Sequence, residues 1–87
     1  MTINQLYTLI RKAEVLRQTG LGKSTFYTHI QKGLMVKAVS LGDRSSSYPL
    51  HEINAINAAR IAGHSEAEIK SLVTELMSKR KELTLKN

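Results

Sequence analysis

Residues 20–22, Gly-Leu-Gly, form a very short connection between two segments that both have helical patterns. Residues 11–19 are good helix formers, and within residues 23–32 the apolar Phe26 and Ile30 are four positions apart and share one helix face. Glycine fits the end of the first helix, where a positive φ is often needed. Two short helices joined by about three residues that include glycine are typical of a helix-turn-helix. We therefore expect this motif, with the leucine of the connection anchored in the core.

The segment after Gly33 has a different pattern. Residues 35–48 contain β-branched residues and an alternation of apolar positions, and Gly-Asp-Arg at 42–44 is a turn signal between two extended runs. The alternating apolar positions are Met35, Val39 and Leu41. The pattern predicts a two-stranded hairpin in which residues 37–41 pair with residues 45–48. A hairpin placed directly after a helix-turn-helix is called a wing.

Two more helices are expected in the second half of the chain. Pro49 suits the first turn of a helix over residues 49–62. Its apolar stripe consists of Leu50, Ile53, Ile56 and Ile61. Ser65 and Glu68 form a capping box that begins a last helix over residues 66–82. The apolar face of that helix consists of Ile69, Leu72, Val73, Leu76 and Met77. Its last five residues are all polar, and we expect that end to project into solvent.

These elements predict a mainly α fold with a small β-hairpin. The prediction is a winged helix-turn-helix, with the helix pair at about 11–32 and the wing at about 35–48, followed by two further helices in a single domain of residues 1–87. A chain of 87 residues is near the lower end of what folds alone. The last apolar stripe is short for a self-sufficient coiled coil, so packing on the domain is favoured, and monomer and homodimer both stay open.

The charge of the chain is concentrated in its first half. Thirteen Lys/Arg against seven Asp/Glu give a net charge of +6. Residues 1–44 carry seven basic and two acidic side chains, net +5, whereas residues 45–87 carry six and five, net +1. A one-sided basic surface attracts polyanions, chiefly nucleic acid. A surface that only aids solubility is the alternative for charge alone.

Several other classes of protein are disfavoured by composition. Without cysteine, disulfides and cysteine-ligated zinc are excluded, and the three histidines, His29, His51 and His64, are not spaced as a metal pair on one helix face. No cofactor and no metal are therefore expected. No apolar run approaches the roughly 20 residues of a membrane span, and the N-terminus lacks the pattern of a secretion signal. We expect no contact with membranes and a cytoplasmic location.

The letters Gly-Leu-Gly-Lys-Ser-Thr at 20–25 also resemble the end of a phosphate-binding loop. That loop needs a glycine five residues before the glycine that precedes lysine, and Arg17 stands there. It must also follow a buried strand, whereas residues 13–19 have a helical pattern. A parallel sheet of βαβ units is missing as well. We therefore expect no nucleotide hydrolysis and no other catalysis.

The second helix has a polar outer face suited to the major groove of DNA. If Phe26 and Ile30 are buried, the most outward positions are Ser24, Thr28 and Gln31. Flanking positions are Thr25, Tyr27 and Lys32, with Lys23 at the N-terminal end. Glutamine can hydrogen-bond adenine bidentately, serine and threonine can donate or accept, and a helix N-terminus with lysine favours a phosphate oxygen. A merely solvated face is the alternative for this helix taken by itself.

The wing adds positive charge to this set. Lys37, Arg44 and Ser45 are its expected DNA contacts, and Arg44 lies near the tip. A wing tip commonly reaches the DNA backbone or the minor groove, where arginine is favoured. Tyr48 is expected to end the hairpin and to pack on the third helix.

The order of these motifs resembles the AlpA family of phage and genomic-island regulators, which is related to excisionases and to the DNA-binding part of MerR-type regulators. The resemblance covers residues 6–76. It is carried by Thr-Gly-Leu at 19–21, Ser-Thr-Phe-Tyr at 24–27 and Gly-Asp-Arg at 42–44. The family often has arginine where Thr28 stands, which moves the expected base contacts toward Lys23, Tyr27 and Gln31.

The resemblance implies a winged-helix protein that binds double-stranded DNA of a prophage or genomic island. It implies a transcriptional regulator, an excisionase that directs recombination, or both, with RNA polymerase or an integrase as the corresponding protein partner. The alternative from another class is a basic helical adaptor that binds an acidic protein without specific DNA binding. The two differ in that only the DNA binder has a preferred sequence and an affinity that falls steeply with salt.

Overall fold

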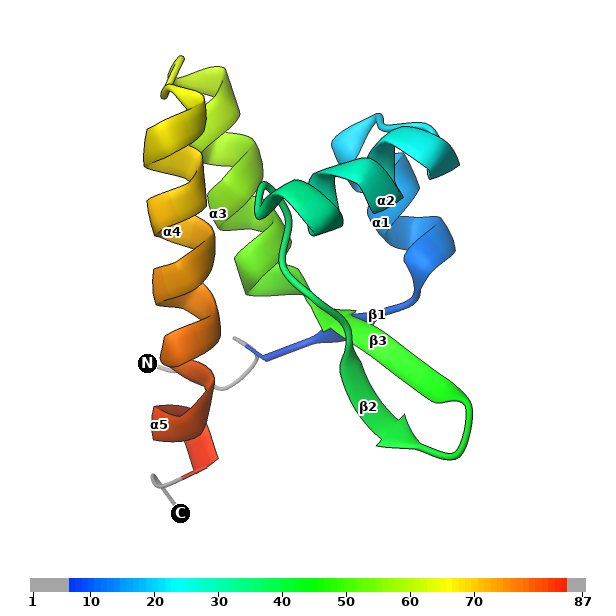
Figure 1. Ribbon diagram of the computed structural model, residues 1–87. Helices are drawn as coiled ribbons and strands as arrows, with labels where there is room; N and C mark the ends of the chain where they lie inside the picture. Colours follow the sequence, from blue (N-terminus) through cyan, green and yellow to red (C-terminus); the bar gives the residue numbers. More distant parts are fainter. Residues whose placement is uncertain (1–6, 85–87) are drawn as a thin grey trace.

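The computed structural model describes residues 7–84 and confirms a mainly helical fold with a small sheet (Figure 1). In chain order the elements are β1 (Leu9–Ile10), α1 (Lys12–Thr19), α2 (Lys23–Lys32), β2 (Val39–Gly42), β3 (Ser45–Pro49), α3 (Leu50–Ile61), α4 (Glu66–Ser78) and α5 (Arg80–Thr84). Figure 1 shows α3 and α4 side by side and antiparallel. The pair α1–α2 lies on the other side of α3, and the β2–β3 hairpin projects away from the helices. This is a winged helix-turn-helix followed by further helices.

Glycines define the helix-turn-helix. Gly20 has a φ of 76° and its N–H donates to the carbonyl of Leu16 at 2.9 Å, which ends α1. A left-handed residue at this place is favourable for glycine because no Cβ clashes with the backbone. Gly33, with a φ of 80°, ends α2 in the same way. The half-buried Leu21 packs against the core from the connection, as the sequence predicted.

The core lies where α1, α2, β3, α3 and α4 meet. Its buried apolar residues are Val15, Phe26, Leu34, Met35, Val36, Tyr48, Ile53, Ile56, Ala59, Ile69 and Val73. One expectation was wrong. Ile61 is 87% exposed, because five residues after Ile56 correspond to about 140° around a helix, and Ala59 is buried instead. Leu41 lies in β2, as the alternation predicted, and is exposed there.

The sheet has three antiparallel strands in the order β1-β3-β2. The hairpin was predicted, but β2 begins at Val39 rather than at residue 37, and the register shifts between Ser40 and Gly42. Strand β1 was not predicted. It pairs Ile10 with Tyr48, and the N–H of Leu50 donates to the carbonyl of Thr8 at 2.8 Å. The β3 side of the hairpin is therefore paired along both of its edges.

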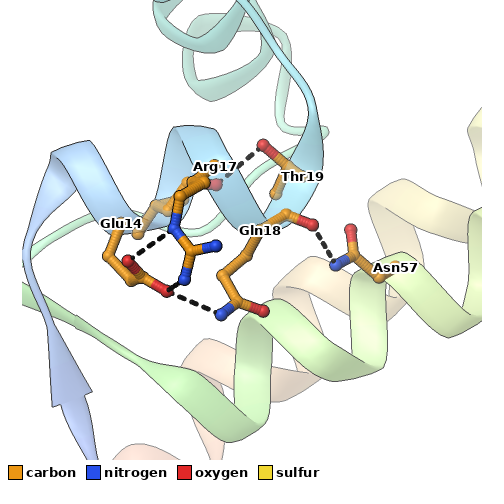
Figure 2. Close-up of polar contacts among 6 residues, drawn as sticks. Glu14, Arg17, Gln18, Thr19 and Asn57 are labelled. Atoms are coloured by element: carbon orange, nitrogen blue, oxygen red, sulfur yellow. Dashed lines mark hydrogen bonds and ion pairs between the residues drawn. The ribbon is translucent and has the colours of Figure 1, made fainter.

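The helix pair α1–α2 is also attached to α3 by polar contacts. Asn57 of α3 donates through Nδ2 to the carbonyl of Gln18 at 3.0 Å, at the end of α1 (Figure 2). On the same side of α1, the carboxylate of Glu14 accepts from Arg17 and from the amide of Gln18. The orientation of the helix-turn-helix on α3 thus depends on side chains as well as on the apolar core.

The C-terminal part departs from the prediction of one continuous helix over residues 66–82. The capping box is confirmed: the N–H of Glu68 donates to Ser65 Oγ at 3.2 Å, and Ser65 N–H donates to Glu68 Oε1 at 2.7 Å. Helix α4 then ends at Ser78, and α5 begins at Arg80. Arg80 does not project into solvent, because its guanidinium lies against Glu52. None of the described helices is long and apolar enough to cross a membrane.

Candidate nucleic-acid interface

The outer face of α2 is polar and carries no carboxylate. Phe26 is fully buried and Ile30 packs against the core, which fixes the rotation of the helix about its axis. The predicted contact residues of α2 are all exposed: Lys23, Ser24, Thr25, Tyr27, Thr28, Gln31 and Lys32. The structure therefore places this set on one accessible helix, with ammonium groups at both ends.

The N-terminus of α2 is open toward solvent. Its first backbone hydrogen bond runs from the N–H of Phe26 to the carbonyl of Gly22 at 2.9 Å, so the three preceding N–H groups have no acceptor within the helix. Gly22 supplies no side-chain cap, and no acidic residue lies in the first turn. Unpaired N–H groups with the adjacent Lys23 favour an anion at this position.

Thr28 is less free than the other polar residues of α2. Its Oγ1 donates to the backbone carbonyl of Ser24 at 3.0 Å. The hydroxyl hydrogen is thereby used within the helix, while the methyl group and the oxygen lone pairs stay available. An acceptor role or a contact with a thymine methyl remains suitable for this side chain.

Lys12 belongs to the same surface, although no sequence pattern predicted a contact for it. Its Nζ donates to the hydroxyl oxygen of Tyr27 at 2.5 Å and lies 4.9 Å from the centre of the ring. This hydrogen bond lowers the pKa of Tyr27 below its usual value of 10.0. The two residues are 15 positions apart, so only the packing of α1 against α2 brings the ammonium group to the middle of the face.

The wing presents Arg44 at its tip and Lys37 at its base. Asp43 and Arg44 form the turn between β2 and β3, and Arg44 has a φ of 56°, which is uncommon for a residue with a side chain. Lys37 is exposed but precedes β2, and Ser45 is only half-exposed at the start of β3. Arg44 and Ser45 are therefore adjacent at the tip of the wing, whereas Lys37 lies apart from them, before β2.

A buried aromatic contact connects the wing to α2. The rings of Phe26 and Tyr48 lie edge to face with their centres 5.5 Å apart. Burial also raises the pKa of Tyr48 above 10.0. Because Tyr48 lies in β3 and Phe26 in α2, this contact helps to fix the position of the hairpin relative to the candidate reading helix. Figure 1 shows the N-terminal end of α2 and the tip of the wing on the side away from α4.

The described residues show no arrangement suited to a metal, and the phosphate-loop geometry is absent there. No group of three His, Cys, Asp or Glu that could hold a metal ion occurs within residues 7–84. Arg17 lies inside α1, and residues 20–25 form the turn and the start of α2. His29 accepts from Arg60 Nη2 at 3.2 Å if its Nδ1 is unprotonated. Desolvation, followed by the charges of Arg60 and Lys32, lowers the pKa of His29 below 6.5.

Comparison with known proteins finds a family match that covers the helix-turn-helix, the wing and α3. Residues 8–61 match the family model described as "Prophage CP4-57 regulatory protein (AlpA)". The chain is also similar to the uncharacterized protein ORF88 of Enterobacteria phage P4, with 41% identity over 54 residues. That alignment covers 62% of this chain and 61% of the phage protein, less than two thirds of its length. No solved structure matches the chain significantly. The family match begins just before β1 and ends with the last residue of α3.

Proposed function

The chain belongs to the AlpA family of prophage regulatory proteins, as its motifs predicted, and on that premise we propose that it binds double-stranded DNA sequence-specifically. In this proposal α2 enters the major groove and the β2–β3 wing contacts the DNA beside it. The protein has a regulatory role and catalyses no reaction. Its cellular role is transcriptional regulation, direction of recombination, or both.

The observation that carries this proposal is the pairing of α2 with the wing. The outer face of α2 has hydroxyl, amide, phenol and ammonium groups without a carboxylate, and the Phe26–Tyr48 contact holds the hairpin that carries Arg44 next to it. A solvated helix face needs neither an acid-free surface nor a hairpin fixed beside it. A protein that follows a groove and the adjacent phosphates benefits from both.

Each part of the surface has a separate task in this proposal. Gln31 and Ser24 contact base edges, and Thr28 accepts a hydrogen bond or contacts a thymine methyl. Lys23 and the open N-terminus of α2 bind a phosphate oxygen. Tyr27, with Lys12 bound to its hydroxyl, contributes a second phosphate contact in the middle of the helix. Thr25 and Lys32 flank these positions.

The wing residues act mainly through charge. Arg44 at the tip reaches the backbone or the minor groove, Lys37 contributes positive charge at the base, and Ser45 follows the turn. These contacts give affinity for any duplex, while α2 supplies the preference for one sequence.

Selection of binding sites from random duplex DNA tests the proposal directly. We expect one enriched sequence and an affinity for it that falls by orders of magnitude between 50 and 200 mM salt. Weak binding without any enriched sequence would favour the rival function, a basic adaptor for an acidic protein.

Footprinting on natural DNA separates the two cellular roles. An accessory recombination factor protects several adjacent sites in the attachment region of its element and acts with the integrase. A transcriptional regulator protects one or two operators and acts on RNA polymerase, as a monomer or as a homodimer. Protection of the promoter alone excludes the recombination role.

A further inference from the structure

Arg80 connects the two ends of the wing to each other at the base of the hairpin. Its Nη2 donates to the backbone carbonyl of Lys37 at 2.8 Å, and Lys37 lies two residues before β2. Its Nε and Nη2 donate to the carboxylate of Glu52 at 2.9 and 2.6 Å. Glu52 lies in the first turn of α3, three residues after the end of β3. One guanidinium group thus contacts the chain just before β2 and just after β3.

The two sides of the hairpin are otherwise held differently. The β3 side pairs with β1, continues into α3, and carries the buried Tyr48. The β2 side is an edge of the sheet and follows a connection whose last buried apolar residue is Val36. The hydrogen bond from Arg80 to the carbonyl of Lys37 is therefore well placed to fix the position at which the β2 side of the hairpin leaves the core.

The environment of Arg80 makes this contact a specific one. The side chain of Glu52 is 1% exposed and that of Arg80 is 23% exposed, so the pair is largely removed from solvent. The fork of the guanidinium group satisfies the carboxylate and the carbonyl at the same time, whereas a lysine ammonium group in its place is a single point charge on a flexible stem. The neighbouring Lys79 instead pairs with Glu75 at 3.1 Å on the surface.

We propose that Arg80 is a positioning residue for the wing, which lets α5 control how the hairpin meets DNA. The residue lies outside residues 8–61, which match the family model, so the C-terminal helices add this control to the matched DNA-binding unit. The proposal rests on the proposed DNA binding for its effect on affinity, but not for the order of the wing in the free protein.

The first experiment requires no DNA. Backbone ¹⁵N relaxation is compared for the full-length protein, Arg80→Lys, and the control Lys79→Gln. We expect order parameters of about 0.85 for the hairpin amides of the wild type and a fall toward about 0.6 in Arg80→Lys, while α1 and α2 stay rigid. Lys79→Gln should resemble the wild type. Unchanged hairpin order in Arg80→Lys overturns the proposal.

The second experiment is a double-mutant cycle on DNA from the binding-site selection. Arg44→Gln should weaken binding about fivefold in the wild type and less than about twofold in Arg80→Lys, because the wing is already misplaced there. Gln31→Ala, which affects only α2, should have the same effect in both backgrounds. An equal effect of Arg44→Gln in both backgrounds overturns the positioning role.

Two further outcomes are distinguishable. If Arg80→Lys is unfolded by circular dichroism, the pair Glu52→Gln and Arg80→Gln, which leaves no buried charge, replaces it in both experiments. If the wild type selects no DNA sequence, the proposed function fails and the effect of Arg80 on DNA binding fails with it. The relaxation experiment still decides whether Arg80 orders the wing.

Discussion

The guanidinium group of Arg80 and the carboxylate of Glu52 form a two-point ion pair between the last helix and the first turn of α3, with N–O distances of 2.9 and 2.6 Å. The two residues are 28 positions apart. Because the carboxylate is almost fully buried, its charge depends on Arg80 for compensation. Helix α5 is therefore part of the folded unit and not a solvated extension of α4.

Removal of Arg80 should destabilise the protein strongly. Arg80→Met leaves the Glu52 carboxylate buried without its partner, and we expect the free energy of unfolding to fall by about 3 kcal/mol in urea denaturation. The double variant Arg80→Met with Glu52→Leu should recover most of this loss. Lys79→Ala, which breaks only the exposed pair with Glu75, should cost less than about 0.5 kcal/mol. Equal losses for Arg80→Met and Lys79→Ala would contradict the buried pair.

Arg44 should lower the free energy of unfolding, although it contributes to the proposed DNA binding. Its φ of 56° is costly for a side-chain-bearing residue, and glycine adopts this conformation freely. Arg44→Gly is expected to raise the free energy of unfolding by about 0.5 kcal/mol, whereas Arg44→Ala keeps the strain and should give no gain. Both variants should weaken binding to all DNA sequences to the same extent. Wild-type affinity in Arg44→Gly would remove the wing tip from the proposed interface.

Much of the fold was predictable because its signals are local. Glycines at the ends of α1 and α2 and the capping box of Ser65 and Glu68 act through neighbouring backbone atoms, so the sequence alone locates them. Strand β1 has only two residues and exists because β3 lies beside it, which no local pattern reveals. The end of α4 at Ser78 could not be predicted either, since residues 78–82 favour a helix and the contacts of Arg80 are long-range.

The residues of the candidate interface also differ in how well the sequence alone predicts their positions. The exposed face of α2 follows from the helical period once Phe26 is placed in the core. Lys12 was missed because its contact with Tyr27 depends on how two helices cross. Lys37 was expected within the hairpin, but the structure places it before β2, where its carbonyl accepts from Arg80. Whether the predicted residues contact DNA stays a prediction.

Because of the capping box, part of the free energy of unfolding should depend on pH in the acidic range. Hydrogen bonds from the backbone and hydroxyl of Ser65 lower the pKa of Glu68 below 4.5. A carboxylate with a lowered pKa stabilises the folded state above the pKa of the unfolded chain, and this contribution is lost as the pH falls through the folded value. We expect the free energy of unfolding to decline below about pH 4.5, with a smaller decline in Glu68→Gln. Parallel pH profiles for the two proteins would contradict this role.

His29 should titrate below a free histidine. Desolvation is the main cause of its lowered pKa, and Arg60 and Lys32 add to it. The neutral imidazole is thus favoured in the folded state, so its contribution to stability is complete above pH 6.5 and is lost as the pH falls through the folded pKa. NMR titration of the ring protons measures this pKa. Arg60→Gln should raise it partly but not to 6.5, since burial persists; a full return would make the Arg60 charge the main cause.

Lys23 and Gln31 should differ in what they contribute to DNA binding, although both are exposed on α2. Lys23→Ala removes a proposed phosphate contact at the helix N-terminus, so it should weaken binding to all sequences and reduce the salt dependence by about one unit of slope. Gln31→Ala removes a proposed base contact, so it should relax the base preference at one position of the DNA site, by about 1–3 kcal/mol, with little change in non-specific affinity.

Competition binding with single-base variants of the selected site, repeated at several salt concentrations, measures both effects. Lys79→Ala, which removes one exposed positive charge outside the proposed interface, is the matched control. If Lys23→Ala and Gln31→Ala change affinity and preference alike, α2 does not enter the groove in the proposed orientation.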